Sequence, residues 1–135
     1  MSAKINETSG QITLTRGDSL WATSKPFYDD EEQTPYEKQE HDVVRFALKS
    51  AQMLPDGSDF VDNEPLFTRD LDWDSTHEYW VLHLVPGDTA ELPFGNYRYD
   101  IELSTNWDSE ATPPANVDVY TYIANKKFKL TPEVE

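Results

Sequence analysis

The chain has 135 residues and no cysteine, which excludes disulfides, thiolate metal sites and a cysteine nucleophile. Its formal net charge is −15, from 26 acidic and 11 basic residues, and such a surface repels nucleic-acid phosphates and anionic membranes. We therefore expect neither nucleic acid nor a membrane as a partner. The length fits one domain, and the aromatic content of 13% favours a packed core over disorder.

Both ends of the chain are polar. Residues 1–9 lack the apolar stretch of a secretory signal, so we expect a tail there and no signal peptide. The domain is predicted over residues 10–130, with an acidic tail at 131–135. No apolar run approaches the roughly 20 residues of a membrane-spanning helix.

Short segments with alternating apolar and polar residues recur along the domain, and alternation places the apolar side chains on one face of a β-strand. The expected strands, in chain order, are 10–15, 20–23, 42–49, 65–71, 78–85, 97–103, 116–123 and 127–130. About seven or eight short strands separated by turn residues are typical of an all-β fold. We predict a single antiparallel β-sandwich of the immunoglobulin-like type.

The clearest alternation lies in residues 82–103. An apolar strand enters, a turn with two prolines and two glycines reverses the chain, and an alternating strand leaves. Asp88 and Thr89 lie in this turn, where their side chains can accept hydrogen bonds from backbone N–H groups. We expect them to be structural and to hold a helical turn over residues 88–92.

The predicted core consists of the inward positions of the expected strands. Its members are Ile12, Leu14, Val44, Phe46, Leu48, Trp80, Leu82, Leu84, Tyr97, Tyr99, Ile101, Leu103, Val117, Val119, Ile123, Phe128 and Leu130.

Two long polar loops are expected, at residues 25–41 and 106–115. Loops of this length are uncommon unless they are functional or mobile. The acidic run at 29–32 is interpreted as a solvated segment, which is the usual state of like charges in sequence. A weak cation site there, or a ligand at either loop, stays open at this point.

Metal and catalytic motifs are incomplete. The aspartates at 70, 72 and 74 have the spacing that opens a calcium loop, but Ser75 and Val81 stand where Gly and Glu are required. Three histidines without cysteine offer few ligands for zinc. The chain has no G-x-S-x-G motif and no phosphate or dinucleotide fingerprint. We therefore expect no catalytic residue, no metal and no cofactor.

Four tryptophans offer an alternative function, because sugars stack on aromatic rings. Trp73 and Trp107 lie in expected loops and are the candidate ligand-binding residues of a carbohydrate- or host-surface-binding module. The competing interpretation places them at the ends of the core, where aromatic rings with one polar edge are common.

Four segments in order resemble one protein family. Residues 10–19 contain I-x-L-x-R-G-D-S, and residues 42–49 resemble a D-x-V-x-F-x-V-K strand, with His41 in place of a preceding Gly. Residues 84–101 resemble L-x-P-x-D-T-x-x-L-x-x-G-x-Y-x-Y-D-I, and residues 128–134 resemble the ending of the same family.

The chain is thus similar to small β-sandwich proteins of phages and prophages of Gram-positive bacteria, which are related to N-terminal domains of baseplate proteins. The resemblance implies a virion structural or accessory protein of a tail or baseplate, with no enzymatic activity and no cofactor. Its implied partners are other phage structural proteins, with a homo-oligomer in the assembly also compatible. Its implied location is the virion, or the bacterial cytoplasm before assembly.

Edge strands of an antiparallel sandwich have unpaired backbone groups and are natural assembly surfaces. The strands at 10–15 and 127–130 are short and lie next to the tails, so we expect them at the edges. Because subunits with 15 net negative charges repel each other, the expected partner has a less acidic or a basic surface.

Overall fold

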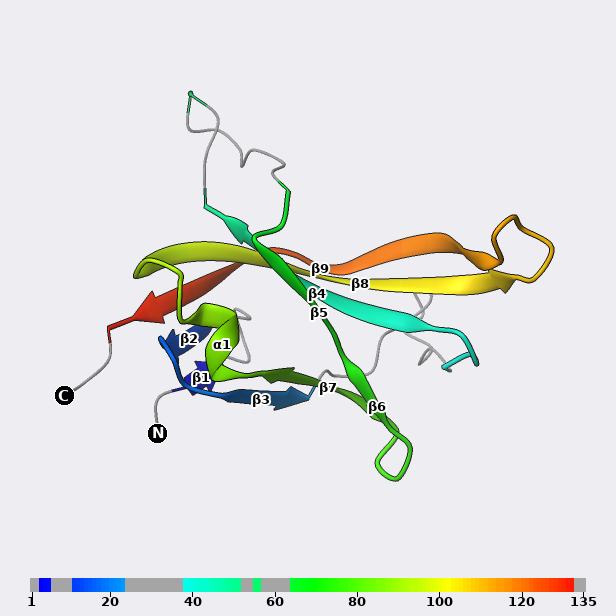
Figure 1. Cartoon of the computed structure of the whole chain (residues 1–135), viewed down its shortest axis with the longest axis horizontal. Helices are drawn as coiled ribbons and strands as arrows, with labels where there is room; N and C mark the ends of the chain where they lie inside the picture. The colour runs from blue at the N-terminus through cyan, green and yellow to red at the C-terminus, as the bar shows by residue number, and fades with distance from the viewer. Residues whose placement is uncertain (1–2, 6–10, 24–37, 52–54, 57–63, 133–135) are drawn as a thin grey trace, which may run out of the picture.

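The computed structural model describes residues 3–5, 11–23, 38–51, 55–56 and 64–132. Within them the chain is an all-β fold with two sheets and one short helix, in agreement with the fold class that the alternation predicts. The sheets lie in two layers, and the helix lies near one end of them (Figure 1). Most of the loop expected at 25–41, including its acidic run, lies outside the described residues.

The larger sheet has six strands in the order β1-β2-β9-β8-β4-β5. The strands are β1 (Ala3–Ile5), β2 (Ile12–Thr15), β4 (Val43–Ser50), β5 (Phe67–Asp70), β8 (Gly95–Asp108) and β9 (Ala115–Thr131). Neighbours are antiparallel except β2 and β9, which run parallel. The expectation of a purely antiparallel fold is wrong for this pair, because the first and last segments of the domain enter the sheet in the same direction.

The smaller sheet has three strands in the order β3-β7-β6. The strands are β3 (Leu20–Thr23), β6 (Asp72–Asp74) and β7 (Tyr79–Leu84). Helix α1 (Pro86–Thr89) then leads from β7 into β8 of the larger sheet. The helical turn begins two residues earlier than the predicted 88–92, because proline at the first helical position is already held at a helical φ.

One hydrophobic core lies between the two sheets. Predicted core residues that are buried are Ile12, Leu14, Val44, Phe46, Leu48, Trp80, Leu82, Leu84, Tyr97, Tyr99, Ile101, Leu103, Phe128 and Leu130. Leu20 and Leu71, which the prediction omitted, complete this core. Each large apolar side chain contributes about 1.5–3 kcal/mol to folding when it is fully buried.

Strand β9 departs from the predicted core at Val117 and Val119, which are exposed. The register between β8 and β9 shifts on either side of Ile101, so that Ile123 lies opposite Ile101 but Thr121 lies opposite the next residue of β8. A β-bulge inserts an extra residue and thereby turns the following side chains to the other face. The two valines therefore face outward, whereas the side chain of Ile123 lies outside the described part.

The edges of the sheets also differ from the prediction. Residues 3–5, expected in the N-terminal tail, form β1 and pair with β2. Strand β2 therefore lies inside the sheet, and residues 128–131 of β9 lie between β2 and β8. The strands expected at the edges are interior, because the tail itself supplies the edge strand. The loop expected at 106–115 is shorter than predicted, since β8 continues to Asp108.

Candidate interaction surface

The hairpin of β8 and β9 extends beyond the rest of the larger sheet (Figure 1). Strand β4 accompanies β8 only as far as the pair of Val43 and Ser104. Beyond that pair, β8 and β9 pair only with each other among the described residues. We call residues 104–108 and 115–121 the arm, which comprises this projecting part and the residues that adjoin it.

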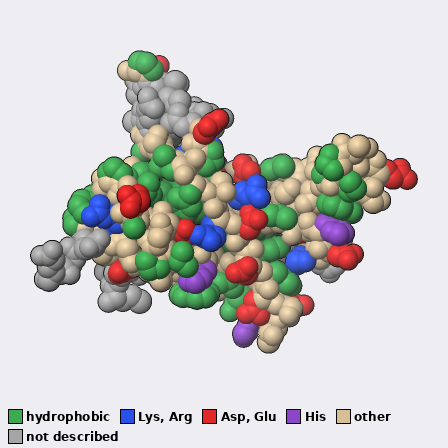
Figure 2. All heavy atoms as spheres, in the orientation of Figure 1, with side chains coloured by type: hydrophobic (Ala, Val, Ile, Leu, Met, Phe, Trp, Pro, Cys, Tyr) green, Lys and Arg blue, Asp and Glu red, His purple; other side chains and the backbone are tan. Residues whose placement is uncertain are grey.

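Large apolar side chains of the arm are open to solvent. Val117 is 58% exposed, Val119 60%, Tyr120 50% and Trp107 43%. Val117 and Val119 lie on one face of the hairpin, and Tyr120 and Trp107 lie on the other. Single exposed apolar residues are normal on protein surfaces, but several of them gathered on one short hairpin favour an interaction site. Figure 2 shows hydrophobic side chains at the right of the view, over the arm.

The segment before β4 holds the base of the arm. The hydroxyl of Thr105 donates a hydrogen bond to the carboxylate of Asp42, and both residues are buried. The side-chain amide of Asn116 donates to the carbonyl oxygen of His41 at 2.9 Å. The rings of His41 and Trp107 stack with centroids 4.2 Å apart. These contacts stabilise a two-stranded ribbon that would be marginal alone in water.

The two tryptophans considered for ligand binding lie in different sheets. Trp73, in β6, is partly buried and meets Trp80 edge-on with ring centroids 5.2 Å apart. Trp107 lies on the arm, and no contact joins it to Trp73 within the described residues. Trp21 is 66% exposed and was not among the candidates, although its place beside the inward Leu20 points it outward.

The side chains of Asp88 and Thr89 both accept hydrogen bonds from backbone N–H groups of nearby residues. The carboxylate of Asp88 accepts a hydrogen bond of 2.9 Å from the backbone N–H of Val85 and also pairs with Arg69. The buried hydroxyl oxygen of Thr89 accepts a hydrogen bond of 3.1 Å from the N–H of Gly17. Both side chains therefore make structural contacts, which link helix α1 to neighbouring segments.

The turn after β2 docks on the same region. The Arg16 guanidinium donates to the carbonyl oxygen of Leu92 at 3.4 Å and lies over the ring of Phe94, 4.1 Å from its centroid. Gly17 has a φ of 85°, in the region that favours glycine. Two of the segments that carry the family resemblance, residues 10–19 and 84–101, are therefore in direct contact.

The aspartates with calcium-loop spacing lie on strands β5 and β6 and not in a loop. The carboxylate of Asp70 pairs with the guanidinium of Arg45 at 2.7 Å. No group of three potential metal ligands that could hold an ion occurs in the part of the chain that the structure describes.

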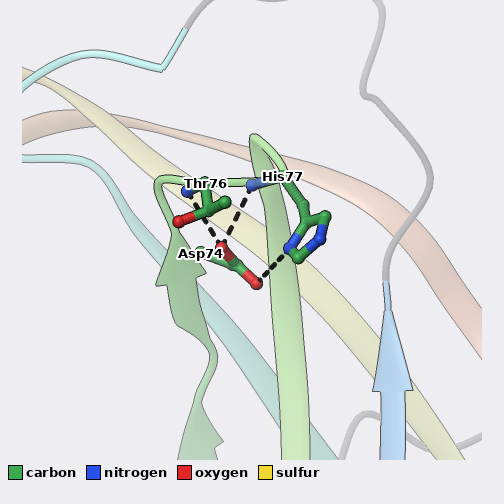
Figure 3. A network of polar contacts seen from close by, with 3 residues as sticks. All are labelled: Asp74, Thr76 and His77. Atoms are coloured by element: carbon green, nitrogen blue, oxygen red, sulfur yellow. Dashed lines mark hydrogen bonds and ion pairs between the residues drawn. The ribbon is translucent and has the colours of Figure 1, made fainter.

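Asp74 organises the turn between β6 and β7 (Figure 3). Its carboxylate accepts hydrogen bonds from the backbone N–H groups of Thr76, at 3.0 Å, and His77, at 3.1 Å. The ring of His77 lies 2.9 Å from the second carboxylate oxygen. The hydrogen bond to this ring, with those to the backbone, lowers the pKa of Asp74. The cluster is exposed and its groups are used to hold the turn.

Comparisons of the chain with protein-family models, with curated proteins and with solved structures found no match. Among the described residues, no helix is both long enough and apolar enough to cross a membrane. The arm is therefore the feature of the described structure on which we base a function.

Proposed function

We propose that this protein is a non-enzymatic structural or accessory protein of a phage or prophage tail or baseplate, and that it acts through protein–protein contacts. The observation that carries the proposal is the exposed apolar surface of the arm. A chain with 15 net negative charges has ample polar residues for its surface, so exposed valines and a tyrosine on one projecting hairpin favour a contact with another protein.

The phage assignment rests on the resemblance of four sequence segments to one family. Its support from the fold is that two of these segments meet through Gly17 and Thr89, so both are needed for one structural contact. The finer description of the fold, an immunoglobulin-like sandwich, is part of the proposal and is supported by two sheets that share one core.

The proposed partners are other structural proteins of the particle, and the proposed location is the virion, or the bacterial cytoplasm before assembly. The net charge of −15 favours a partner with a less acidic or a basic contact surface.

A carbohydrate- or host-surface-binding module is the second candidate. The exposed ring of Trp107 favours it. It has less support, because Trp73 packs on Trp80 in another sheet and the rings of Trp107 and His41 already stack. Soluble glycans that quench tryptophan fluorescence in the intact protein, but not in Trp107→Ala, would favour this function over the first.

The test of the leading proposal is the composition of phage particles. Prophages of the source bacterium are induced, the particles are purified by density gradient, and their proteins are quantified by mass spectrometry. We expect this protein in the particle fraction at a constant ratio to tail or baseplate proteins. Its absence from intact particles, while it is abundant in the soluble lysate, would contradict the proposal.

A further inference from the structure

Strand β9 has an unpaired edge within the described part of the chain. Strand β2 accompanies it only over residues 128–131. Towards the hairpin end, none of the described strands lies beside β9 on the side away from β8. Backbone N–H and C=O groups on this side are available to pair with another strand.

The bulges of β9 limit this edge to a short regular stretch. Both register shifts against β8 lie between residues 121 and 126 of β9, where a bent backbone prevents continuous pairing. Residues 115–121 are paired with β8 without interruption in register. We call residues 115–121 the open edge.

Apolar side chains lie on both faces of the open edge. Val119 lies opposite Ser104 of β8 and faces away from the core, whereas Tyr120 lies opposite Leu103 and faces the core side. Both side chains are at least half exposed. A strand added at this edge would therefore bury apolar surface on both of its faces as well as pair its backbone.

The sequence around the open edge is acidic. The sequence contains no lysine or arginine from residue 99 to residue 125, whereas Asp108, Glu110 and Asp118 lie on or next to the arm. Asp118 is the one charged residue of the open edge, and its carboxylate accepts a hydrogen bond from the side chain of Asn106 at 2.5 Å. A partner strand that approaches this edge gains from positive charge.

A second copy of the chain is a poor occupant of the open edge. Antiparallel pairing of residues 115–121 with the same residues of another copy would place Asp118 opposite Asp118 at the centre. Like charges directly opposite each other destabilise a pair of strands. The repulsion between two whole chains of charge −15 acts in the same direction.

We propose that the open edge binds an extended segment of a different protein, in which β-branched or aromatic residues alternate and a lysine or arginine lies opposite Asp118. This inference deepens the proposed function and rests on it, because it assigns the contact surface and the chemistry of the partner.

The test uses the intact protein and two synthetic probe peptides. Both peptides alternate valine and threonine, and they differ only in a central arginine or a central glutamate. Binding is followed by fluorescence anisotropy, and amide hydrogen exchange of the protein locates the bound peptide. We expect the arginine peptide to bind more tightly than the glutamate peptide and to slow the exchange of amides in residues 115–121.

Charge-reversal variants separate a local contact from general attraction. Asp118→Lys and Asp72→Lys change the net charge by the same amount, but Asp72 is an exposed residue of β6 in the other sheet. We expect Asp118→Lys to lower the affinity for the arginine peptide by about tenfold or more. Asp72→Lys should change this affinity by less than about twofold. Asp118→Asn keeps an acceptor for the side chain of Asn106, so the intermediate loss that we expect for it reflects the removed charge and not a lost hydrogen bond.

Four results would overturn the inference. Two concern binding: the arginine peptide does not bind, or both lysine variants lose the same amount of affinity for it. Two concern amide exchange: the peptide slows it only in β1 or β5, or exchange at the open edge slows as protein concentration rises in the absence of peptide. The last result would identify a second copy as the occupant. Failure of this inference is distinguishable from failure of the proposed function. Normal incorporation of Asp118→Lys into particles would contradict only the assignment of the open edge as the contact surface. Absence of the native protein from particles would contradict the proposed function itself.

Discussion

Individual residues of this protein place polar groups in buried sites, and the fold supplies their partners. The hydroxyl oxygen of Thr89 accepts a hydrogen bond from the N–H of Gly17. The buried carboxylate of Asp100 pairs with the ammonium group of Lys49 at 3.0 Å. A buried polar group without a partner costs about 1–3 kcal/mol, so each of these contacts favours one arrangement of its segments over others.

Tyr99 gives a prediction for alkaline pH. Burial raises the pKa of Tyr99 to about 12, whereas tyrosine in an unfolded chain has a pKa of about 10. Because the unfolded chain loses this proton first, the associated stability is fully present below about pH 10 and is lost as pH rises towards 12. We expect the free energy of unfolding, measured by urea denaturation, to decline over this range, and to decline less in Tyr99→Phe. Equal declines in both proteins would contradict the prediction.

Glu78 gives a prediction for backbone strain. Its φ of 56° lies in the left-handed region, which costs a residue with a side chain about 1–2 kcal/mol. We expect Glu78→Gly to raise the free energy of unfolding by up to about 1 kcal/mol, because relief of strain exceeds the entropy cost of glycine. Glu78→Val should lower it, since a β-branched residue fits this region poorly. The prediction fails if urea denaturation gives the two variants the same stability.

At the scale of elements, the main feature is that β9 is buried in the core at one end and exposed at the other. After the bulges Phe128 and Leu130 are fully buried, whereas before them Val119 and Tyr120 are exposed on the two opposite faces of the strand. A single strand thus contributes to the core at one end and offers an exposed apolar surface at the other. The bulges separate these two parts and determine where the open edge ends.

Truncation of one apolar residue on β8 and one on β9 tests this difference in burial. Ile101→Ala removes a buried side chain and should lower the free energy of unfolding by roughly 2–5 kcal/mol. Val119→Ala, on the exposed part of β9, serves as the matched control and should change it by less than about 0.5 kcal/mol. Thermal and urea denaturation measure both values. A large loss in the control would show that Val119 is covered.

The contact between helix α1 and the turn after β2 is tested by a double variant. Asp88→Ala with Thr89→Ala removes the acceptors for the N–H groups of Val85 and Gly17. We expect a loss of about 1–3 kcal/mol for each residue changed, measured by urea denaturation. Glu91→Ala, at an exposed position of the same segment, is the control and should be close to neutral. Unchanged stability of the double variant would contradict the structural role.

At the scale of the whole molecule, charge and the arm act in opposite directions. The net charge of −15 keeps copies apart, whereas the exposed apolar residues of the arm favour burial against another surface. The combination favours association with an unlike partner over self-association. Lysine and arginine are absent from residues 99–125, so the acidic character extends over the arm itself.

Salt dependence of the mass in solution tests this balance. We expect a monomer at low ionic strength, because like charges repel over about 30 Å at 0.01 M salt. Raised salt screens this repulsion and should increase any self-association, as measured by light scattering coupled to size exclusion. An oligomer at low salt that dissociates as salt rises would show that attractive ion pairs hold it, which would contradict the repulsion argument.

The sequence by itself determined the all-β class and most of the core. Period-two alternation is a local property, so the inward positions of β4, β7 and the first part of β8 follow from the order of residues alone. The sequence also predicted the structural role of Asp88 and Thr89, because proline at residue 86 favours the start of a helical turn.

Tertiary structure decided the parallel pairing of β2 with β9, the place of β1 at the edge, and the outward face of Val117 and Val119. Pairing between distant segments depends on how the whole chain closes around its core, which no local pattern specifies. Only the register against β8 shows that Val117 and Val119 face away from the core, and only the strand order shows that this part of β9 has an open edge among the described residues.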